Sequence, residues 1–290
     1  MRRAMRWAIA AAALAAAGCG RKSVHEGPET HLHLVALLSR PTALTGSALA
    51  RRMSERWGLQ VQSVGERSER GTREFVLEGD AHRVRVLVQP KPLPPDLTRL
   101  VDEGAPTLAP ADRAALKRHR AVVQVDYIGG SAPPVEQAGF AARAILTVAE
   151  LPGFVGYVDP TAMLYRPASV LADFREQRSL SREELYLLLV EVHSVEEEDG
   201  GLWMHTHGME QFGAPDVEAR FTDKRRWQYY WELLANAALY MMERGPVLKP
   251  GHTAELAGDG VIYEARAAKA DPEHPTGAKG RIELARRGGG

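Results

Sequence analysis

Two histidines separated by one residue, His205 and His207, have the types and spacing best suited to chemistry in this sequence. Alternate residues of a β-strand point to the same face, so on a strand both imidazoles could hold one Zn²⁺ ion. Asp216 or Glu218 could supply a third ligand. The fourth position would then hold a water molecule, whose pKa the metal lowers to about 7.

With a general base beside this water, the segment would be the active site of a zinc-dependent hydrolase. Glu191 or Glu210 could be that general base. The His-Thr-His core is similar to the zinc motif of metalloisopeptidases, in which proline follows the second histidine and a serine and an aspartate come later. Here Gly208 replaces that proline, and Pro215 and Glu218 stand at the later positions. These departures remove the family's metal-binding aspartate and its oxyanion-stabilising hydroxyl.

A structural role explains the same segment without a ligand, and it is the interpretation that we favour. Residues 205–207 would end a strand, and Gly208 would adopt a backbone angle that side chains disfavour. Phe212 would fill the core, and Glu218 would accept hydrogen bonds from amides of the turn. A third interpretation is a binding loop for a protein or small molecule. Its residues would be His205, His207, Gly208, Met209, Phe212 and Glu218.

The beginning of the chain has the pattern of a bacterial lipoprotein signal peptide. Three arginines within the first six residues precede an apolar run at residues 7–17, and small residues lead to Cys19. The run is too short for a permanent membrane-spanning helix. We therefore expect cleavage before Cys19 and attachment of lipid, including palmitate, to its thiol. Gly20 follows in place of the aspartate typical of inner-membrane retention, which favours the outer membrane on its periplasmic side.

Composition excludes some classes of protein and partner. The 37 basic residues balance the 37 acidic ones, so no basic footprint for nucleic acid is expected. Cys19 is the only cysteine, so no disulfide can form within the chain. Stability must come from an apolar core, for which the 44% hydrophobic content is adequate. No cofactor-binding pattern such as a glycine-rich phosphate loop is present.

Apolar patterning predicts an α+β fold in one main domain, with helices packed on a mixed sheet. We expect a signal peptide at residues 1–18, a tether at 19–30, the domain at 31–267 and a disordered tail at 268–290. Helix patterns follow Thr45 and Asp223, and another runs from about Pro134 to Leu151. The clearest strand patterns are at residues 82–89, 121–128, 154–158 and 185–195.

The order of these features resembles a bacterial family known as domain of unknown function 4261. The segments that carry the resemblance are residues 34–41, 136–151, 153–167, 207–218 and 245–253. The family pattern of Gly-Met followed by Phe-Gly-x-Pro is met by Gly208, Met209, Phe212, Gly213 and Pro215. The resemblance implies an α+β fold and no established activity.

These observations favour a membrane-anchored binding or structural domain over an enzyme. The alternatives are the zinc-dependent hydrolase centred on His205 and His207, and an immunity-type protein that neutralises a toxin through residues 208–218. The partner is expected to be an unidentified protein or small molecule.

Overall fold

The computed structural model describes residues 32–95, 98, 108–160, 162–269 and 278–287. The predicted signal peptide, the tether and Cys19 lie outside these residues. The α+β class is confirmed, with one antiparallel and one mixed sheet. The contacts divide the chain after Leu180 into an N-terminal and a C-terminal unit, whereas the sequence analysis expected one main domain with one sheet.

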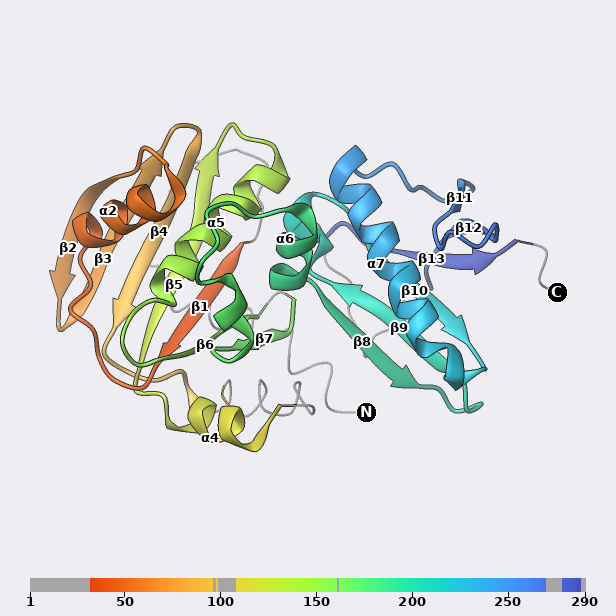
Figure 1. The fold of residues 1–290 in the computed structure, drawn as a ribbon, viewed down its shortest axis with the longest axis horizontal. Helices are drawn as coiled ribbons and strands as arrows, with labels where there is room; N and C mark the ends of the chain where they lie inside the picture. The colour runs from red at the N-terminus through yellow and green to blue at the C-terminus, as the bar shows by residue number, and fades with distance from the viewer. Residues whose placement is uncertain (1–31, 96–97, 99–107, 161, 270–277, 288–290) are drawn as a thin grey trace. The chain divides into compact units, whose positions relative to one another are not determined.

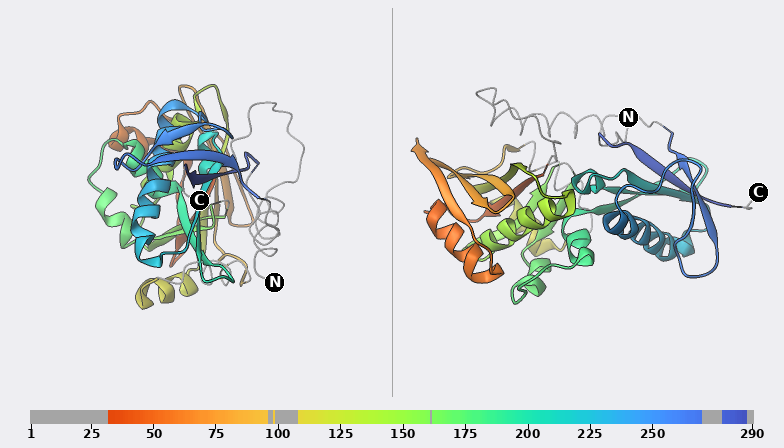
Figure 2. Two further views of the ribbon diagram at one scale, coloured as in Figure 1. Left: turned by 90° about the vertical axis from the view of Figure 1, so that its right-hand side faces the viewer. Right: turned by 90° about the horizontal axis from the view of Figure 1, so that it is seen from above.

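The N-terminal unit contains a seven-stranded antiparallel sheet in the order β2-β3-β4-β5-β1-β6-β7 (Figure 1). Helices α2 and α5 lie together over one face of it (Figure 2). Its strands are β1 (His33–Leu38), β2 (Gln62–Glu69), β3 (Thr72–Gly79), β4 (His82–Gln89), β5 (Ala121–Gly130), β6 (Phe154–Asp159) and β7 (Leu164–Pro167). Its helices are α2 (Gly46–Trp57), α4 (Pro110–Arg118), α5 (Pro134–Val148) and the short 3₁₀ helix η1 (Val170–Phe174).

Local signals explain where α2 begins and ends, as predicted. The Thr45 hydroxyl accepts a hydrogen bond from the Ala48 amide at 3.2 Å, which satisfies one of the free donors of the first turn. Gly58 ends the helix with a φ of 66°, a conformation that disfavours other residues. The predicted apolar face is buried against the sheet and α5.

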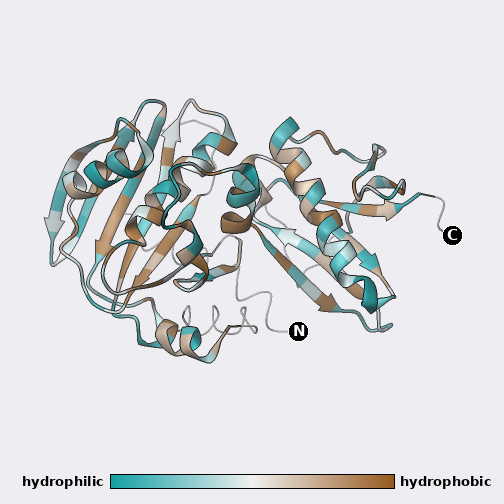
Figure 3. Cartoon of the chain, viewed as in Figure 1, coloured by the Kyte–Doolittle hydropathy of each residue, from teal (hydrophilic) through white to brown (hydrophobic). Residues whose placement is uncertain are grey.

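Both faces of the first sheet contribute to the core, because its central strands are apolar on both sides. Val35 and Leu37 of β1 pack with Leu116 of α4 in one buried cluster. Leu34 and Ala36, which alternate with them, are also fully buried. Figure 3 shows the apolar residues concentrated along β1, β4 and β5.

The C-terminal unit contains a six-stranded mixed sheet in the order β11-β12-β13-β10-β9-β8, with β10 and β13 parallel. Helix α7 packs on β9 and β10 and contacts α6. The strands are β8 (Glu191–Glu196), β9 (Leu202–His207), β10 (Asp216–Phe221), β11 (Thr253–Glu255), β12 (Ile262–Ala267) and β13 (Arg281–Arg286). The helices are α6 (Arg182–Leu189), α7 (Trp227–Arg244) and the 3₁₀ turns η2 (Met209–Phe212) and η3 (Lys224–Arg226).

The strand predicted at residues 185–195 is wrong in its first half, which belongs to α6. Ser181 accepts a hydrogen bond from the Glu184 amide, and the Glu184 side chain accepts one from the Ser181 amide. This capping box fixes a helix start. The chain becomes extended at Val190, so only residues 191–196 form a strand.

The prediction of a disordered tail at residues 268–290 is wrong at Arg281–Arg286. This segment is β13, which lies between β12 and β10 in the middle of the sheet. Ile282 and Leu284 are buried, so the segment has the alternation of a strand. Only six residues carry that alternation, which is too short a signal beside glycines and charged residues.

The aromatic helix α7 is confirmed, with two differences at its start. Asp223 accepts a hydrogen bond from the Arg225 amide and so caps η3 rather than α7. Trp227, expected on the buried face, is 54% exposed, whereas Leu234, Ala238 and Met241 are buried. No helix among the described residues is both long and apolar enough to cross a membrane.

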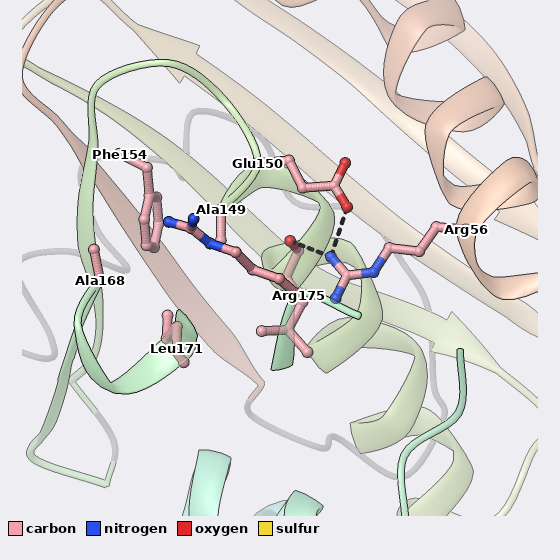
Figure 4. Close-up of a pocket in the computed structure, with 8 residues that line it drawn as sticks. Arg56, Ala149, Glu150, Phe154, Ala168, Leu171 and Arg175 are labelled. Carbon is pink, nitrogen blue, oxygen red and sulfur yellow. Dashed lines mark hydrogen bonds and ion pairs between the residues drawn. The ribbon is translucent and has the colours of Figure 1, made fainter. Parts of the chain in front are cut away.

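Arg56 of α2 joins two helix ends in the N-terminal unit, beside a surface hollow that Figure 4 shows. Its Nη1 donates to the Leu146 carbonyl oxygen at 2.9 Å and to Glu150 Oε1 at 2.8 Å, and its Nη2 donates to the Phe174 carbonyl oxygen at 2.5 Å. The side chain is 5% exposed. A cation that satisfies carbonyls at helix C-termini stabilises both ends.

We expect Arg56→Met to lower the free energy of unfolding by about 2–4 kcal/mol, because two carbonyls and Glu150 lose their donor. Urea denaturation monitored by circular dichroism measures this loss. Arg52 is the control, since it lies 3.9 Å from the same Glu150 but is 40% exposed. Arg52→Met should cost less than about 1 kcal/mol, and equal losses would contradict the role given to Arg56.

Candidate functional site

Strand β9 places His205 and His207 on the same face of the second sheet, as predicted. In the register with β8, His193 lies opposite His205 and Glu191 lies opposite His207. In the register with β10, Glu218 lies opposite His205. The structure therefore brings residues from three neighbouring strands onto one face.

Three histidines on this face, His193, His205 and His207, form what we call the histidine cluster. The ring centroids of His205 and His207 are 4.8 Å apart, those of His193 and His207 are 4.7 Å apart, and those of His193 and His205 are 5.8 Å apart. Trp203 stacks on His205 with a centroid distance of 4.1 Å. His205 and His207 are buried. Sequence analysis missed His193, because only the pairing of β8 with β9 brings it to the other two.

Asp216 does not join the histidine cluster, so its prediction as a metal ligand is corrected. Its Oδ1 accepts hydrogen bonds from the Thr206 hydroxyl at 3.0 Å and from the Met209 amide at 3.2 Å. The Thr206 oxygen in turn accepts a hydrogen bond from the Val217 amide at 2.9 Å. Thr206 alternates with the two histidines along β9, so its side chain leaves the strand on the other face. Asp216 thus closes the turn between β9 and β10.

Glu218 has a different role from the predicted one. Glu218 was expected to accept hydrogen bonds from amides of the turn. In the structure, Asp216 is the carboxylate that accepts the hydrogen bond from the Met209 amide. Glu218 instead accepts hydrogen bonds from the Trp203 indole at 3.1 Å, from Arg281 at 3.3 Å and from Arg220. Both Glu218 and the Arg281 side chain are fully buried. Glu218 is therefore a buried anion that pairs with two cations.

The predicted binding loop is largely packed into the domain. Met209 and Phe212 are buried, as the structural interpretation expected of Phe212. Gly208 and Gly213 have φ values of 110° and 73°, which only glycine adopts without strain. Glu210, a candidate general base, accepts a hydrogen bond from the Ala278 amide at 2.8 Å. This loop therefore presents few of the predicted side chains to a ligand.

The side chains in their present orientations do not form a complete metal site. Within the described part of the chain, no three or more His, Cys, Asp or Glu residues are arranged to hold an ion. The rings of the histidine cluster pack edge-to-face and stacked instead, an arrangement that stabilises cross-strand aromatic pairs.

Comparison with known proteins gives one match, to a family model, and the matched residues lie in the C-terminal unit. Residues 205–274 match the model of the domain of unknown function DUF4261. The chain contains a DUF4261 domain. The match begins at His205 and runs through β10, α7, β11 and β12. The resemblance expected for the segments before residue 205 lies outside the match. The chain matches no curated protein and no solved structure.

Burial raises the pKa of Asp216 to about 7, with a further contribution from the charge of Glu210. The hydrogen bonds from Met209 and Thr206 and the charge of Arg281 act in the opposite direction but are outweighed. Between about pH 4 and 7 the Asp216 carboxyl therefore binds more protons in the native state than in the unfolded state, so its contribution to stability falls as the pH rises through this range.

We expect Asp216→Asn to remove this dependence, because the amide oxygen can still accept both hydrogen bonds but does not titrate. Between pH 4 and 7 the wild type should lose up to about 4 kcal/mol of its free energy of unfolding through Asp216. The variant should not show this loss. Urea denaturation at a series of pH values measures the difference between the two proteins. Parallel profiles for both would show that Asp216 does not bind the extra proton.

We expect Glu218→Gln to lower the free energy of unfolding by about 3 kcal/mol, because Arg281 and Arg220 lose the buried charge that balances them. Glu197 is the matched control, since it also pairs with Arg220, at 3.0 Å, but is 32% exposed. Glu197→Gln should cost less than about 1 kcal/mol in the same denaturation experiment. A loss for Glu218→Gln no larger than that of the control would refute the assignment.

Proposed function

We propose that this chain is a lipid-anchored protein of the cell envelope whose DUF4261 domain binds or supports a partner, and that it is not a hydrolase. The anchor rests on the sequence alone. The three early arginines, the apolar run at residues 7–17 and the small residues before Cys19 support it. Gly20 favours the outer membrane.

The observation that carries the non-catalytic role is the use within the domain of Asp216 and Glu218, the two candidates for the third metal ligand. Asp216 accepts hydrogen bonds from Thr206 and Met209, and Glu218 accepts them from Trp203, Arg220 and Arg281. A metal-dependent hydrolase needs carboxylates that reach the metal or its water. Asp216 and Glu218 instead hold these other partners, so neither supplies the third metal ligand.

A binding or structural role agrees better with the charges of this unit. Glu218 of β10 pairs with Arg220 of the same strand and with Arg281 of β13, so these buried charges are used within the domain. A domain of this kind, held at a membrane by its own lipid, can present its surface to a protein or small molecule of the envelope.

The anchor is tested by expressing the full chain in a Gram-negative host supplied with labelled palmitate. We expect label in the wild type and none in Cys19→Ser, which should also leave the membrane fraction, because a single thiol carries the lipid. Circular dichroism of the variant should match that of the wild type. An unlabelled wild-type protein that stays in the aqueous phase would overturn the proposal.

A further inference from the structure

We infer that His119 is a pH-sensitive switch in the N-terminal unit. Neutral His119 holds a proline-rich segment on the core, and protonated His119 releases it. The segment is residues 90–95, directly after β4, and we call it the strap. This inference goes beyond the proposed membrane role and does not depend on it.

The hydrogen bonds of His119 define its state of protonation. Its Nε2 lies 2.8 Å from the amide nitrogen of Leu93, which can only donate, so Nε2 accepts and carries no proton. Its Nδ1 lies 2.5 Å from the carbonyl oxygen of Leu116, which can only accept, so Nδ1 carries the proton. Only the neutral imidazole with its proton on Nδ1 satisfies both partners.

A second proton on His119 is incompatible with the closed strap. It would bind to Nε2 and place two N–H groups against each other, neither of which can accept a hydrogen bond. His119 is only 3% exposed, so water does not reach the ring to replace the lost partner. The imidazolium therefore requires that Leu93 move away from Nε2.

The surroundings of His119 also disfavour a positive charge. Burial lowers the pKa of His119, and the charge of Arg120 lowers it further, whereas the hydrogen bond to the Leu116 carbonyl acts in the opposite direction. Residues 88–95 and 113–125 contain no acidic side chain. The cations of these two segments are Lys91, Arg113, Lys117, Arg118 and Arg120.

The carboxylates of the neighbouring elements have other partners. Asp112 of α4 accepts a hydrogen bond from Ser169, and Asp126 of β5 pairs with His33 and Arg85. Helix α4 packs on β6 (Figure 1), whose Asp159 accepts a hydrogen bond from the Ala162 amide. Burial raises the pKa of Tyr165, the titratable side chain of the adjoining apolar cluster, so Tyr165 stays neutral.

The strap is built to open as a local unit. Four of its six residues are prolines, which have no N–H, so Lys91 and Leu93 carry its only backbone donors. The Leu93 amide is the donor to His119, and the Leu93 side chain is 4% exposed in the cluster that contains Leu116, Val122 and Tyr165. Release of Leu93 would uncover this part of the cluster without breaking the ladder of the sheet.

The direction of the pH effect follows from where the proton binds. In the open form the imidazole meets water and has the ordinary pKa of about 6.5, whereas the closed form resists the proton. The closed form therefore has its full stability above about pH 6.5 and loses it as the pH falls. Between pH 7.5 and 5 the open population should rise by up to about thirtyfold.

Nuclear magnetic resonance can follow the Leu93 amide alone, because Pro92-Leu93 is the only Pro-Leu pair in the sequence. Carbon-13 in the proline carbonyls and nitrogen-15 in leucine then give a single cross-peak. We use the full chain with Cys19→Ser, which takes no lipid. Its amide exchange rate, relative to that of an unstructured peptide of the same sequence at the same pH, measures opening. We expect protection to fall at least fivefold from pH 7.5 to pH 5.

Two variants assign this fall to His119. In His119→Gln the amide oxygen can accept the hydrogen bond from Leu93 but does not titrate, so protection should change less than about twofold between the two pH values. His82→Gln is the matched control, since burial also lowers the pKa of His82. His82 contacts Tyr127 and Phe140 rather than the strap, so this variant should keep the full change.

Unchanged protection of Leu93 in the parent chain would overturn the inference, as would an equal fall in His119→Gln. If His119→Gln does not fold, the nitrogen-15 shifts of the His119 ring in the parent chain decide. A ring that gains its second proton while Leu93 stays protected would contradict the switch. The palmitate experiment measures the anchor separately, so either result can fail without the other.

Discussion

The buried carboxylate of Glu218 connects three neighbouring strands, and the C-terminal unit depends on the balance of charge around it. Glu218 lies on β10, and its donors Trp203 and Arg281 come from β9 and β13. Arg220 and Arg281 both also lie over the Trp203 ring, at 4.9 and 5.1 Å. A cation over an indole face gains further stabilisation when it is removed from water. One anion, two cations and one indole thus hold the centre of the sheet together.

The two faces of the second sheet therefore differ in chemical character. On one face α7 covers the apolar residues of β10, such as Val217 and Phe221, and Phe221 stacks on Tyr230 of the helix. The other face carries the histidine cluster and the charges around Glu218. Asp216 stands at the end of β10 and closes the turn to β9. The sheet therefore has an apolar face for packing and a polar face on which Glu218 pairs with Arg220 and Arg281.

Sequence reasoning succeeded where the signal is local. The helix that follows Thr45 could be predicted because its cap, its apolar spacing and Gly58 lie within fourteen residues. The shared face of His205 and His207 follows from alternation alone. Strand β13 and His193 were missed because pairing between distant segments decides both. The helix α6 is a different case, since Ser181 and Glu184 form a capping box that could have been recognised. The partners of Asp216 and Glu218 could not be predicted, because the sequence does not reveal that Thr206 and Met209 meet Asp216 or that Arg281 of a distant strand meets Glu218.

The position of β13 has a consequence for biosynthesis. The last strand in the sequence fills the middle of the sheet, between β12 and β10. Until residues 281–286 have left the ribosome, β10 and β12 have nothing between them, and Glu218 lacks one of its two arginines. The C-terminal unit can therefore complete its sheet only after residues 281–286 have been synthesised. A nascent chain would remain open in this half while the sheet of the first half already has all its strands.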